Sequence, residues 1–318
     1  MLSNTIFSVD LAQSIGTAGE FRKTVAEIMK EVATPNVADY FPVLKKLDPL
    51  GVRRRTAIHF SKILDVFHDL VSRRKKLGEN TGSITNNDIL DVLISKENRE
   101  VMEGERIQRL SLDLFLAGID TTTSTLEWAM AELLRNPRAM SKAKVELEKT
   151  IGRGKPVEGS DIAKLPYLQA ILKETFRLHP AVPFLLPRKA EIDVELGGYT
   201  IPKGAQVLVN VWAIGRDASL WKNAEQFIPE RFLDSEIDVK GRNFELTPFG
   251  AGRRLCPGYP LALRMLLLML GSLVNCFDWK LEGGLKAEQM DMDDKFGITL
   301  EKAQPVVVVP YSRLHTVG

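Results

Sequence analysis

The amino-acid sequence predicts a mainly α-helical protein with small β-sheet elements. In most of the chain, apolar residues recur at the spacing of one helix face, in segments separated by prolines. One stretch, Glu105 to Arg135, contains no proline and is long enough for a central buried helix. By contrast, Val194 to Val211 shows the β-branched alternation of a hairpin. Because no repeat, low-complexity tract or linker interrupts the 318 residues, we expect a single domain covering residues 1–318.

The first third of the chain predicts helices with interruptions. Glu20–Val32 and Thr56–Lys76 both carry apolar residues at helical spacing. The basic run 73–76 suits the C-terminus of the second helix as a solvated end, and Gly78 is a plausible stop. A short helix is expected from Asp88 to Ser95.

The rest of the chain alternates helices with short strands. Gly197 and Gly198 predict the turn of the hairpin. The other expected elements are helices at Arg138–Ile151, Pro166–His179 and Pro260–Val274, and strands at Trp279–Leu281 and Val306–Val309.

Composition limits the classes of protein. The chain is 44% hydrophobic and 26% charged, which is ordinary for a globular protein, and its net charge of +2 predicts no nucleic-acid partner. Its two cysteines, Cys256 and Cys276, are too few for a disulfide framework and fit a reducing compartment. The opening residues show no signal or anchor, and the apolar run Met265–Val274 is too short to span a bilayer.

Cys256 lies in a segment that suits an iron-bound thiolate. Such a ligand needs backbone amides turned toward sulfur, a nearby cation and a chain that passes close to a flat macrocycle. Gly252 and Gly258 permit the close approach, and Arg254 supplies the cation. The alternative is a glycine-rich turn before a helix, with an incidental thiol.

The segment FGAGRRLCPG, Phe249 to Gly258, resembles the cysteine loop of the cytochrome P-450 family at every position that the family fixes. This resemblance implies a partial cytochrome P-450 fold, haem as the cofactor and Cys256 as the axial ligand of the haem iron. In the family, Phe249, Gly252, Arg254 and Gly258 would belong to the haem-binding loop.

The middle of the long helix contains polar residues in an apolar setting. Gly118 would cost about 1 kcal/mol of helix stability, so an offsetting role is expected there. By resemblance, Ala117 and Gly118 lie beside haem, and Asp120 and Thr121 occupy the acidic and hydroxyl positions of the oxygen-activation motif. Two shorter helices are the alternative, the first ending at Gly118 and the second opening with the Ser-x-x-Glu capping box that begins at Ser124.

Glu174 and Arg177 have the spacing of an ion pair one helical turn apart. The same spacing occurs at Glu103 with Arg106 and at Glu132 with Arg135, where a surface pair is a sufficient explanation. By resemblance, Glu174, Arg177 and the later Arg231 form a buried structural network that holds the cysteine loop.

Other family positions define the surroundings of the cofactor and the substrate. The resemblance implies that Arg188 contacts a haem propionate. It also implies a substrate pocket lined by Ile119, Val182, Phe184 and Ile298. Trp212 and Arg216 have the Trp-x-x-x-Arg spacing of another haem contact, but they lie too late in the chain for that role. The histidines His59, His68, His179 and His315 lack metal-ligand spacing, so no metal role is expected for them.

The resemblance is strongest to the plant terpenoid-hydroxylase branch, which includes geraniol hydroxylases, as in Phe184–Ala190 and Lys295–Leu300. The chain matches only the later part of the family pattern, without the N-terminal anchor, the early helices or the early Trp-x-x-x-Arg contact. We therefore expect a truncated chain with an exposed apolar patch and weak haem retention. The family implies the cytosolic face of the endoplasmic reticulum membrane, reached through the missing anchor.

The expected activity is insertion of one oxygen atom from O2 into a small apolar, terpenoid-like substrate, with NADPH electrons supplied by a separate reductase. Asp120 and Thr121 would deliver protons, and Arg188 and Arg254 would hold haem. Two alternatives stay open: a haem-thiolate isomerase or dehydratase that needs no reductase, and a non-catalytic haem-binding remnant.

Overall fold

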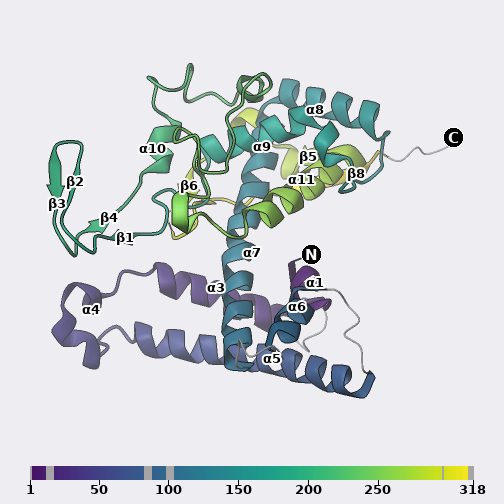
Figure 1. Cartoon of the computed structure of the whole chain (residues 1–318). Coiled ribbons are helices and arrows are strands. Elements are labelled where there is room, and N and C mark those ends of the chain that lie inside the picture. Colours follow the sequence, from purple (N-terminus) through teal and green to yellow (C-terminus); the bar gives the residue numbers. More distant parts are fainter. Residues whose placement is uncertain (1, 12–17, 82–87, 98–103, 296, 314–318) are drawn as a thin grey trace. The chain divides into compact units, whose positions relative to one another are not determined.

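The structure is a computed structural model that describes residues 2–11, 18–81, 88–97, 104–295 and 297–313 (Figure 1). The chain divides into two compact units, Met1–Asp120 and Thr121–Gly318. Each unit has its own cluster of buried apolar side chains. The described residues are mainly helical with short strands, so the predicted fold class is confirmed.

The first unit is built from helices alone within its described residues. They are α1 (Leu2–Phe7), α3 (Ala18–Ala33), α4 (Val37–Tyr40), the 3-10 helix η1 (Pro42–Lys46), α5 (Val52–Thr81), α6 (Ile89–Glu97) and the beginning of α7 (Gly104–Arg135). Helices α3 and α5 pack along each other (Figure 1). The core includes three aromatic rings: Phe67 lies 5.0 Å from Phe7 and 5.7 Å from Phe115 between ring centroids.

The end of α5 differs from the sequence prediction. Helix α5 continues through Gly78 to Thr81, so Gly78 is not its stop. The basic run is not a wholly solvated end either. The Arg74 guanidinium donates to Asp88 at 2.9 Å, to Asp91 at 2.5 Å and to the Phe7 carbonyl at 2.7 Å. These tertiary bonds stabilise the last turns beyond what local propensity predicts.

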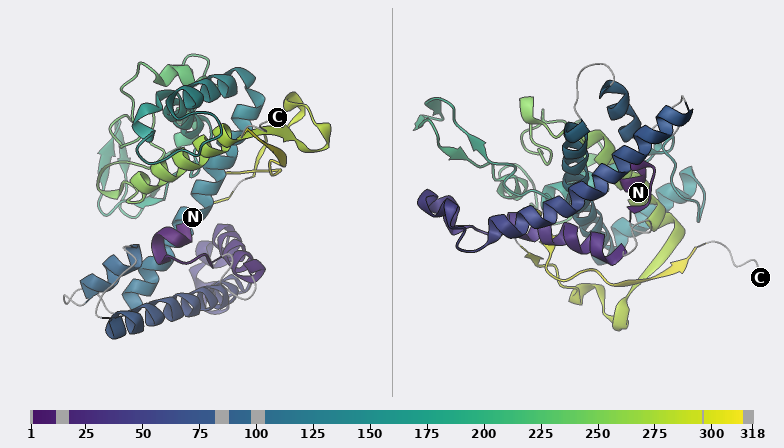
Figure 2. Two further views of the ribbon diagram at one scale, coloured as in Figure 1. Left: turned by 90° about the vertical axis from the view of Figure 1, so that its right-hand side faces the viewer. Right: turned by 90° about the horizontal axis from the view of Figure 1, so that it is seen from below.

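The second unit contains the remainder of α7 and the helices α8 (Pro137–Thr150), α9 (Pro166–Leu178) and α11 (Tyr259–Cys276). Helix α11 packs against α8 and α9 (Figure 2). A side chain at Gly271 would place its Cβ 2.6 Å from Val157 and 2.9 Å from Leu168, so only glycine permits this approach. Helix α11 is long and apolar enough to cross a membrane by composition, and it buries Leu266, Leu270 and Val274 in the core.

Four antiparallel strand pairs lie in the described part of the second unit. They are β1 (Arg188–Lys189) with β4 (Gln206–Val207), β2 (Val194–Leu196) with β3 (Tyr199–Ile201), β5 (Phe277–Leu281) with β8 (Val308–Ser312), and β6 (Asp294–Lys295) with β7 (Glu301–Lys302). The predicted hairpin is confirmed, and its turn residues Gly197 and Gly198 have φ of 59° and 82°. Its C-terminal part also forms a short helix, α10 (Val211–Gly215), that the alternation did not predict.

The remaining 3-10 turns are short. They are η2 (Ile162–Lys164), η3 (Pro229–Phe232), η4 (Gly252–Arg254), η5 (Glu282–Gly284) and η6 (Ala287–Gln289). Of these, η3 and η4 carry candidate site residues. Sequence periodicity cannot detect these elements of three or four residues, because each completes only about one turn.

Candidate functional site

Cys256 lies between η4 and α11, half-buried, in a loop closed by its own backbone. The Cys256 amide donates to the Phe249 carbonyl at 3.0 Å, and the Leu255 amide donates to the Gly252 carbonyl at 3.1 Å. Gly250 and Gly252 have φ of 73° and 64°, a left-handed conformation that residues with a side chain rarely adopt. The two glycines therefore allow the chain to turn tightly before the thiol.

The backbone on either side of the thiol includes two glycines, Gly252 and Gly258, which have no side chains. A Cβ placed on Gly252 would meet no atom within 4 Å, and one placed on Gly258 would lie 3.8 Å from Cys256 Sγ. Behind the loop, the Phe249 ring packs edge-on against Phe176 of α9 at 5.1 Å and lies 6.1 Å from Tyr259 of α11. A rigid loop that presents sulfur beside bare backbone suits a flat macrocycle.

Two candidate propionate ligands belong to the same unit as Cys256. Arg188, in β1, is half-buried, with a guanidinium nitrogen 4.0 Å from the position that a Cβ on Gly250 would occupy. Arg254, in η4, is exposed. Within the described residues, neither guanidinium is paired with a carboxylate. Together with the thiol and the bare glycines, these uncompensated cations fit an anionic, iron-containing macrocycle such as haem.

Glu174, Arg177 and Arg231 form a buried ion network. Glu174 is 0% exposed and Arg177 is 1% exposed. The two residues join through paired bonds of 2.8 Å each, and Arg231 Nε donates to Glu174 at 3.0 Å. Paired guanidinium–carboxylate geometry is the arrangement that compensates two desolvated charges.

The network also fixes a long irregular segment. Arg177 donates to the carbonyls of Gly215 at 2.5 Å, Ala224 at 2.6 Å and Gln226 at 3.0 Å. The neighbouring Phe176 is the residue that contacts Phe249 of the cysteine loop. The structure therefore brings Glu174 and Arg177 of α9 together with Arg231 of η3, and α9 links this network to the cysteine loop through Phe176.

Of the other two Glu-x-x-Arg pairs, the one at Glu132 differs from the prediction. Glu132 is only 8% exposed and bonds His179 at 2.8 Å, so a surface pair with Arg135 is the wrong interpretation of this glutamate. The burial of Glu132 among other chain segments decides its partner. Glu103 lies outside the described residues.

The candidate oxygen-activation residues lie on a continuous helix. Helix α7 runs unbroken through Ala117, Gly118, Ile119, Asp120 and Thr121, so the alternative of two helices is wrong. Ser124 does not cap a helix either, because it lies inside α7; its hydroxyl donates to the Leu300 carbonyl at 2.7 Å. A Cβ on Gly118 would lie 2.9 Å from the end of the Leu2 side chain of α1.

The structure joins two of the candidate substrate segments. The Leu300 amide donates to the Ala181 carbonyl at 2.8 Å, which brings the segment containing Ile298 to the one containing Val182. The backbone at Phe184 is held by a second bond of this kind: the Val209 amide donates to the Phe184 carbonyl at 3.3 Å. Ile119 belongs to the other unit.

Trp212 and Arg216 form a local cation–π pair. The Arg216 guanidinium lies 4.1 Å from the Trp212 ring centroid and donates to the Leu178 carbonyl at 2.5 Å. Its second partner is Glu225 at 3.4 Å. These contacts give Arg216 a structural role on the C-terminal end of α9.

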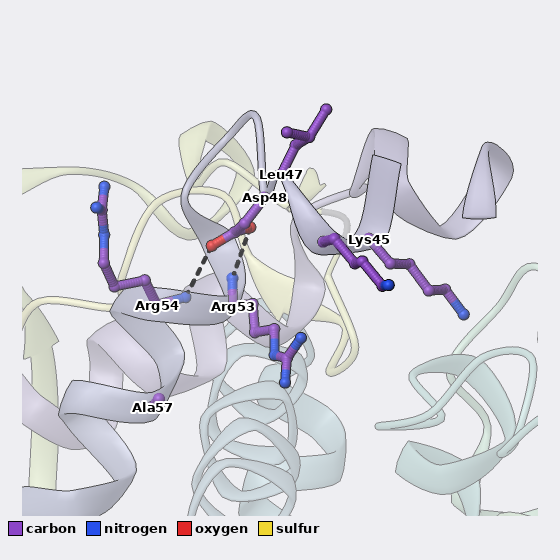
Figure 3. Close-up of a pocket in the computed structure, with 7 residues that line it drawn as sticks. Lys45, Leu47, Asp48, Arg53, Arg54 and Ala57 are labelled. Atoms are coloured by element: carbon purple, nitrogen blue, oxygen red, sulfur yellow. Dashed lines mark hydrogen bonds between the residues drawn. The ribbon is translucent and has the colours of Figure 1, made fainter. Parts of the chain in front are cut away.

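A separate cavity of about 370 Å³ lies in the first unit (Figure 3). It is lined by Lys45, Lys46, Leu47, Asp48, Arg53, Arg54 and Ala57. Asp48 accepts the backbone amides of Arg53 at 3.2 Å and Arg54 at 3.0 Å, so its carboxylate caps the start of α5. None of the candidate haem or substrate residues lines this cavity.

The fold and the site define a class of protein: the chain belongs to the cytochrome P450 family, whose sequence pattern matches residues 1–307. Family membership implies a haem cofactor. A zebrafish cytochrome P450 solved with abiraterone superposes with a TM-score of 0.80 at 28% identity, covering 99% of this chain and 69% of that one. The same fold is found in a zebrafish cytochrome P450 solved with progesterone, with a TM-score of 0.80 at 29% identity over 98% of this chain and 68% of that one.

The particular relatives are plant enzymes. Geraniol 8-hydroxylase of Catharanthus roseus is 55% identical over 98% of this chain and 63% of its own length. Drimenol monooxygenase of Persicaria hydropiper is 56% identical over 98% of this chain and 62% of its own length. The predicted likeness to the plant terpenoid-hydroxylase branch is confirmed. The chain spans less than two-thirds of the length of these curated relatives.

Proposed function

We propose that the chain is the haem-thiolate portion of a monooxygenase that inserts one oxygen atom from O2 into a small apolar substrate of the terpenoid class. The single observation that carries this proposal is the cysteine loop, in which a thiol lies beside bare glycine backbone and two uncompensated arginines. The relatives named for geraniol and drimenol support the substrate class. The electrons would come from NADPH through a separate reductase.

Each proposed site residue has a distinct task. Bound haem would supply the activation of O2. Cys256 would hold the iron through its thiolate, with Phe249, Gly252 and Gly258 shaping the loop, and Arg188 and Arg254 would pair with the propionates. Ala117 and Gly118, two small residues of α7, would lie beside the macrocycle.

Proton delivery and substrate binding fall to other residues. Asp120 would take up protons from solvent, and the Thr121 hydroxyl would deliver them to the O2-binding side of the site. Val182, Phe184, Ile298 and Ile119 would supply the apolar wall for the substrate. Glu174, Arg177 and Arg231 touch no reactant and would preserve the shape of the loop.

The test compares the two cysteines. Cys256→Ser should abolish the red-shifted carbon-monoxide band of the reduced haem protein, because serine cannot supply a thiolate to iron. Cys276→Ser is the matched control. Burial raises the pKa of the Cys276 thiol, and its Sγ lies 3.5 Å from the Gly154 carbonyl, which is a structural contact. A band that survives Cys256→Ser would contradict the assignment of the axial ligand.

The activity is tested with geraniol, NADPH and a plant reductase. Oxidised product that carries one atom of labelled O2 supports the monooxygenase. Product that forms without NADPH would favour an isomerase or dehydratase. Full haem binding without any product would favour the non-catalytic remnant.

We further propose that the protein works at the cytosolic face of the endoplasmic reticulum membrane. The first unit exposes apolar residues beside a basic cluster. We call it the 40–50 surface, and its apolar members are Tyr40, Phe41, Val43, Leu47 and Leu50, with exposures of 45% to 88%. Its basic members Lys45, Lys46, Arg53 and Arg54 line the cavity of Figure 3. An apolar surface edged by lysine and arginine is the pattern that binds an anionic lipid interface.

A further inference from the structure

The backbone of Leu300 is fixed at both of its polar atoms. Its carbonyl accepts hydrogen bonds from Ser124 Oγ at 2.7 Å and from Trp128 Nε1 at 3.2 Å. Its amide donates to the Ala181 carbonyl at 2.8 Å. Ser124, Trp128 and Leu300 are 3%, 1% and 4% exposed, so water cannot replace a lost partner. The two donors also fill both lone pairs of the carbonyl.

The indole that makes one of these bonds is itself immobilised. The Trp128 ring is stacked on His179 with centroids 3.9 Å apart and planes 7° apart. His179 is held by Glu132 at 2.8 Å. Lys302 Nζ lies 4.6 Å from the Trp128 ring centroid and donates to the Asp291 carbonyl at 2.5 Å. The direction of the Nε1–H bond is therefore held by ring contacts from two other segments, those of His179 and Lys302.

Leu300 and Ala181, whose backbones are bonded to each other, are close in sequence to two candidate substrate residues. Ile298 lies two residues before Leu300, in the turn between β6 and β7, and Val182 follows Ala181 directly. Two residues span at most about 7 Å of extended chain, so the backbone of Ile298 lies within about 7 Å of the fixed backbone of Leu300. Helix α7 also carries Thr121, three residues before Ser124.

We infer that Ser124 and Trp128 are positioning residues that set where the substrate lies, by holding Leu300 and through it Ile298 and Val182. The inference rests on the function proposed above. Neither residue needs to touch substrate or haem. Their bonds attach the substrate-facing turn to the helix that bears Thr121, so one rigid support places both the substrate wall and the proposed proton donor.

The experiment removes one donor at a time from the haem-loaded protein. Trp128→Phe keeps an aromatic ring to stack on His179 but deletes Nε1–H, and Ser124→Ala deletes the hydroxyl. One lost hydrogen bond corresponds to a change of about 3- to 10-fold. We expect the KM for geraniol to rise by that factor and the ratio of hydroxylated positions to change, whereas the carbon-monoxide band is kept. Because the two donors share one acceptor, their effects should not be additive.

Matched controls exist in the same unit. Trp279 Nε1 donates to the Leu273 carbonyl at 3.0 Å, so Trp279→Phe deletes an equivalent indole bond that does not reach the β6–β7 turn. Ser272 Oγ accepts the Val157 amide at 2.9 Å, so Ser272→Ala is the control for the hydroxyl. The inference is overturned if Trp128→Phe leaves KM and product ratio within about 2-fold of Trp279→Phe, less than one lost hydrogen bond would give.

A second readout does not depend on turnover. Hydrogen exchange of the Leu300 amide reports the bond to Ala181, and it should accelerate about 3- to 10-fold in Trp128→Phe but not in Trp279→Phe. If the unaltered protein binds haem but does not oxidise geraniol, the proposed function fails, and the exchange result still decides whether Trp128 holds Leu300. Unchanged exchange in Trp128→Phe would overturn the inference.

Discussion

At the level of single residues, Cys256 depends on its neighbours for its proposed chemistry. Its loop is rigid because Gly250 and Gly252 take left-handed conformations and Phe249 packs against two helices. Cys276 has none of these features and contacts the Gly154 carbonyl instead. Two cysteines of similar exposure therefore have different roles, which follow from the backbone around each.

A prediction at this scale concerns His179. Burial lowers the pKa of His179, so below about pH 7 the folded protein protonates this imidazole less than the unfolded chain, which protonates it near pH 6.5. The unfolded state then binds more protons, so stability is lost as the pH falls below about 6.5, by up to about 1.4 kcal/mol per pH unit. His179→Phe should lower stability at pH 7 but flatten this dependence between pH 7 and 5, measured by urea unfolding. Exposed His68, replaced by Asn, is the control, and an equally steep dependence in His179→Phe would contradict the prediction.

At the level of elements, α9 links the core to the cysteine loop. Its buried face includes Glu174, Phe176 and Arg177, so the helix carries the ion network and the contact to Phe249 within one turn. The helix bounds were predicted closely because Pro166 starts the helix and the apolar spacing is regular. Its partners in the segment 215–228 could not be predicted, because no local pattern specifies bonds to carbonyls about forty residues away.

The prediction for α9 is a large loss of stability on Glu174→Gln. The substitution leaves the buried Arg177 guanidinium and the half-buried Arg231 guanidinium without their carboxylate, and loss of a buried partner typically costs about 3–5 kcal/mol. Glu105→Gln is the control. Its pair with Arg109 has side chains 79% and 72% exposed and should contribute at most about 0.5 kcal/mol. Chemical unfolding with haem content as the second readout measures both, and similar losses in the two variants would refute a buried role for Glu174.

At the level of the whole molecule, the net charge is only +2, but basic residues are concentrated in one region of the surface. The 40–50 surface gathers Lys45, Lys46, Arg53 and Arg54 beside exposed apolar side chains. The sequence did not predict this surface, because it falls in the interruption between the two predicted helices, Glu20–Val32 and Thr56–Lys76. The short helices α4 and η1 present Tyr40 and Val43 to solvent.

The prediction at this scale is selective binding to anionic vesicles. Each basic residue near an anionic membrane contributes about 1 kcal/mol, so Lys45→Glu with Lys46→Glu should weaken partition about 10-fold or more. Val43→Asp should weaken it as well by removing apolar contact. The control is Leu196→Asp, because Leu196 is 63% exposed on the β2–β3 hairpin. Co-sedimentation that is insensitive to the charge reversal and to salt would contradict the prediction.

The sequence by itself determined the helices, the hairpin and the family, because each depends on residues close together in the chain. Apolar spacing marks helix faces, the glycine pair marks a turn, and the ten residues of the cysteine loop carry the family pattern. Whether the chain is one domain, and the roles of Asp120, Thr121 and the other site residues, stay predictions.

The tertiary structure alone decided which polar groups are partners. Glu132 bonds His179 and not Arg135. The Ser124 hydroxyl donates to a carbonyl 176 residues away and does not take part in a capping box. The physical reason is burial. A polar group removed from water must find a partner, and the nearest one in space is fixed by how distant segments pack, which local spacing does not contain.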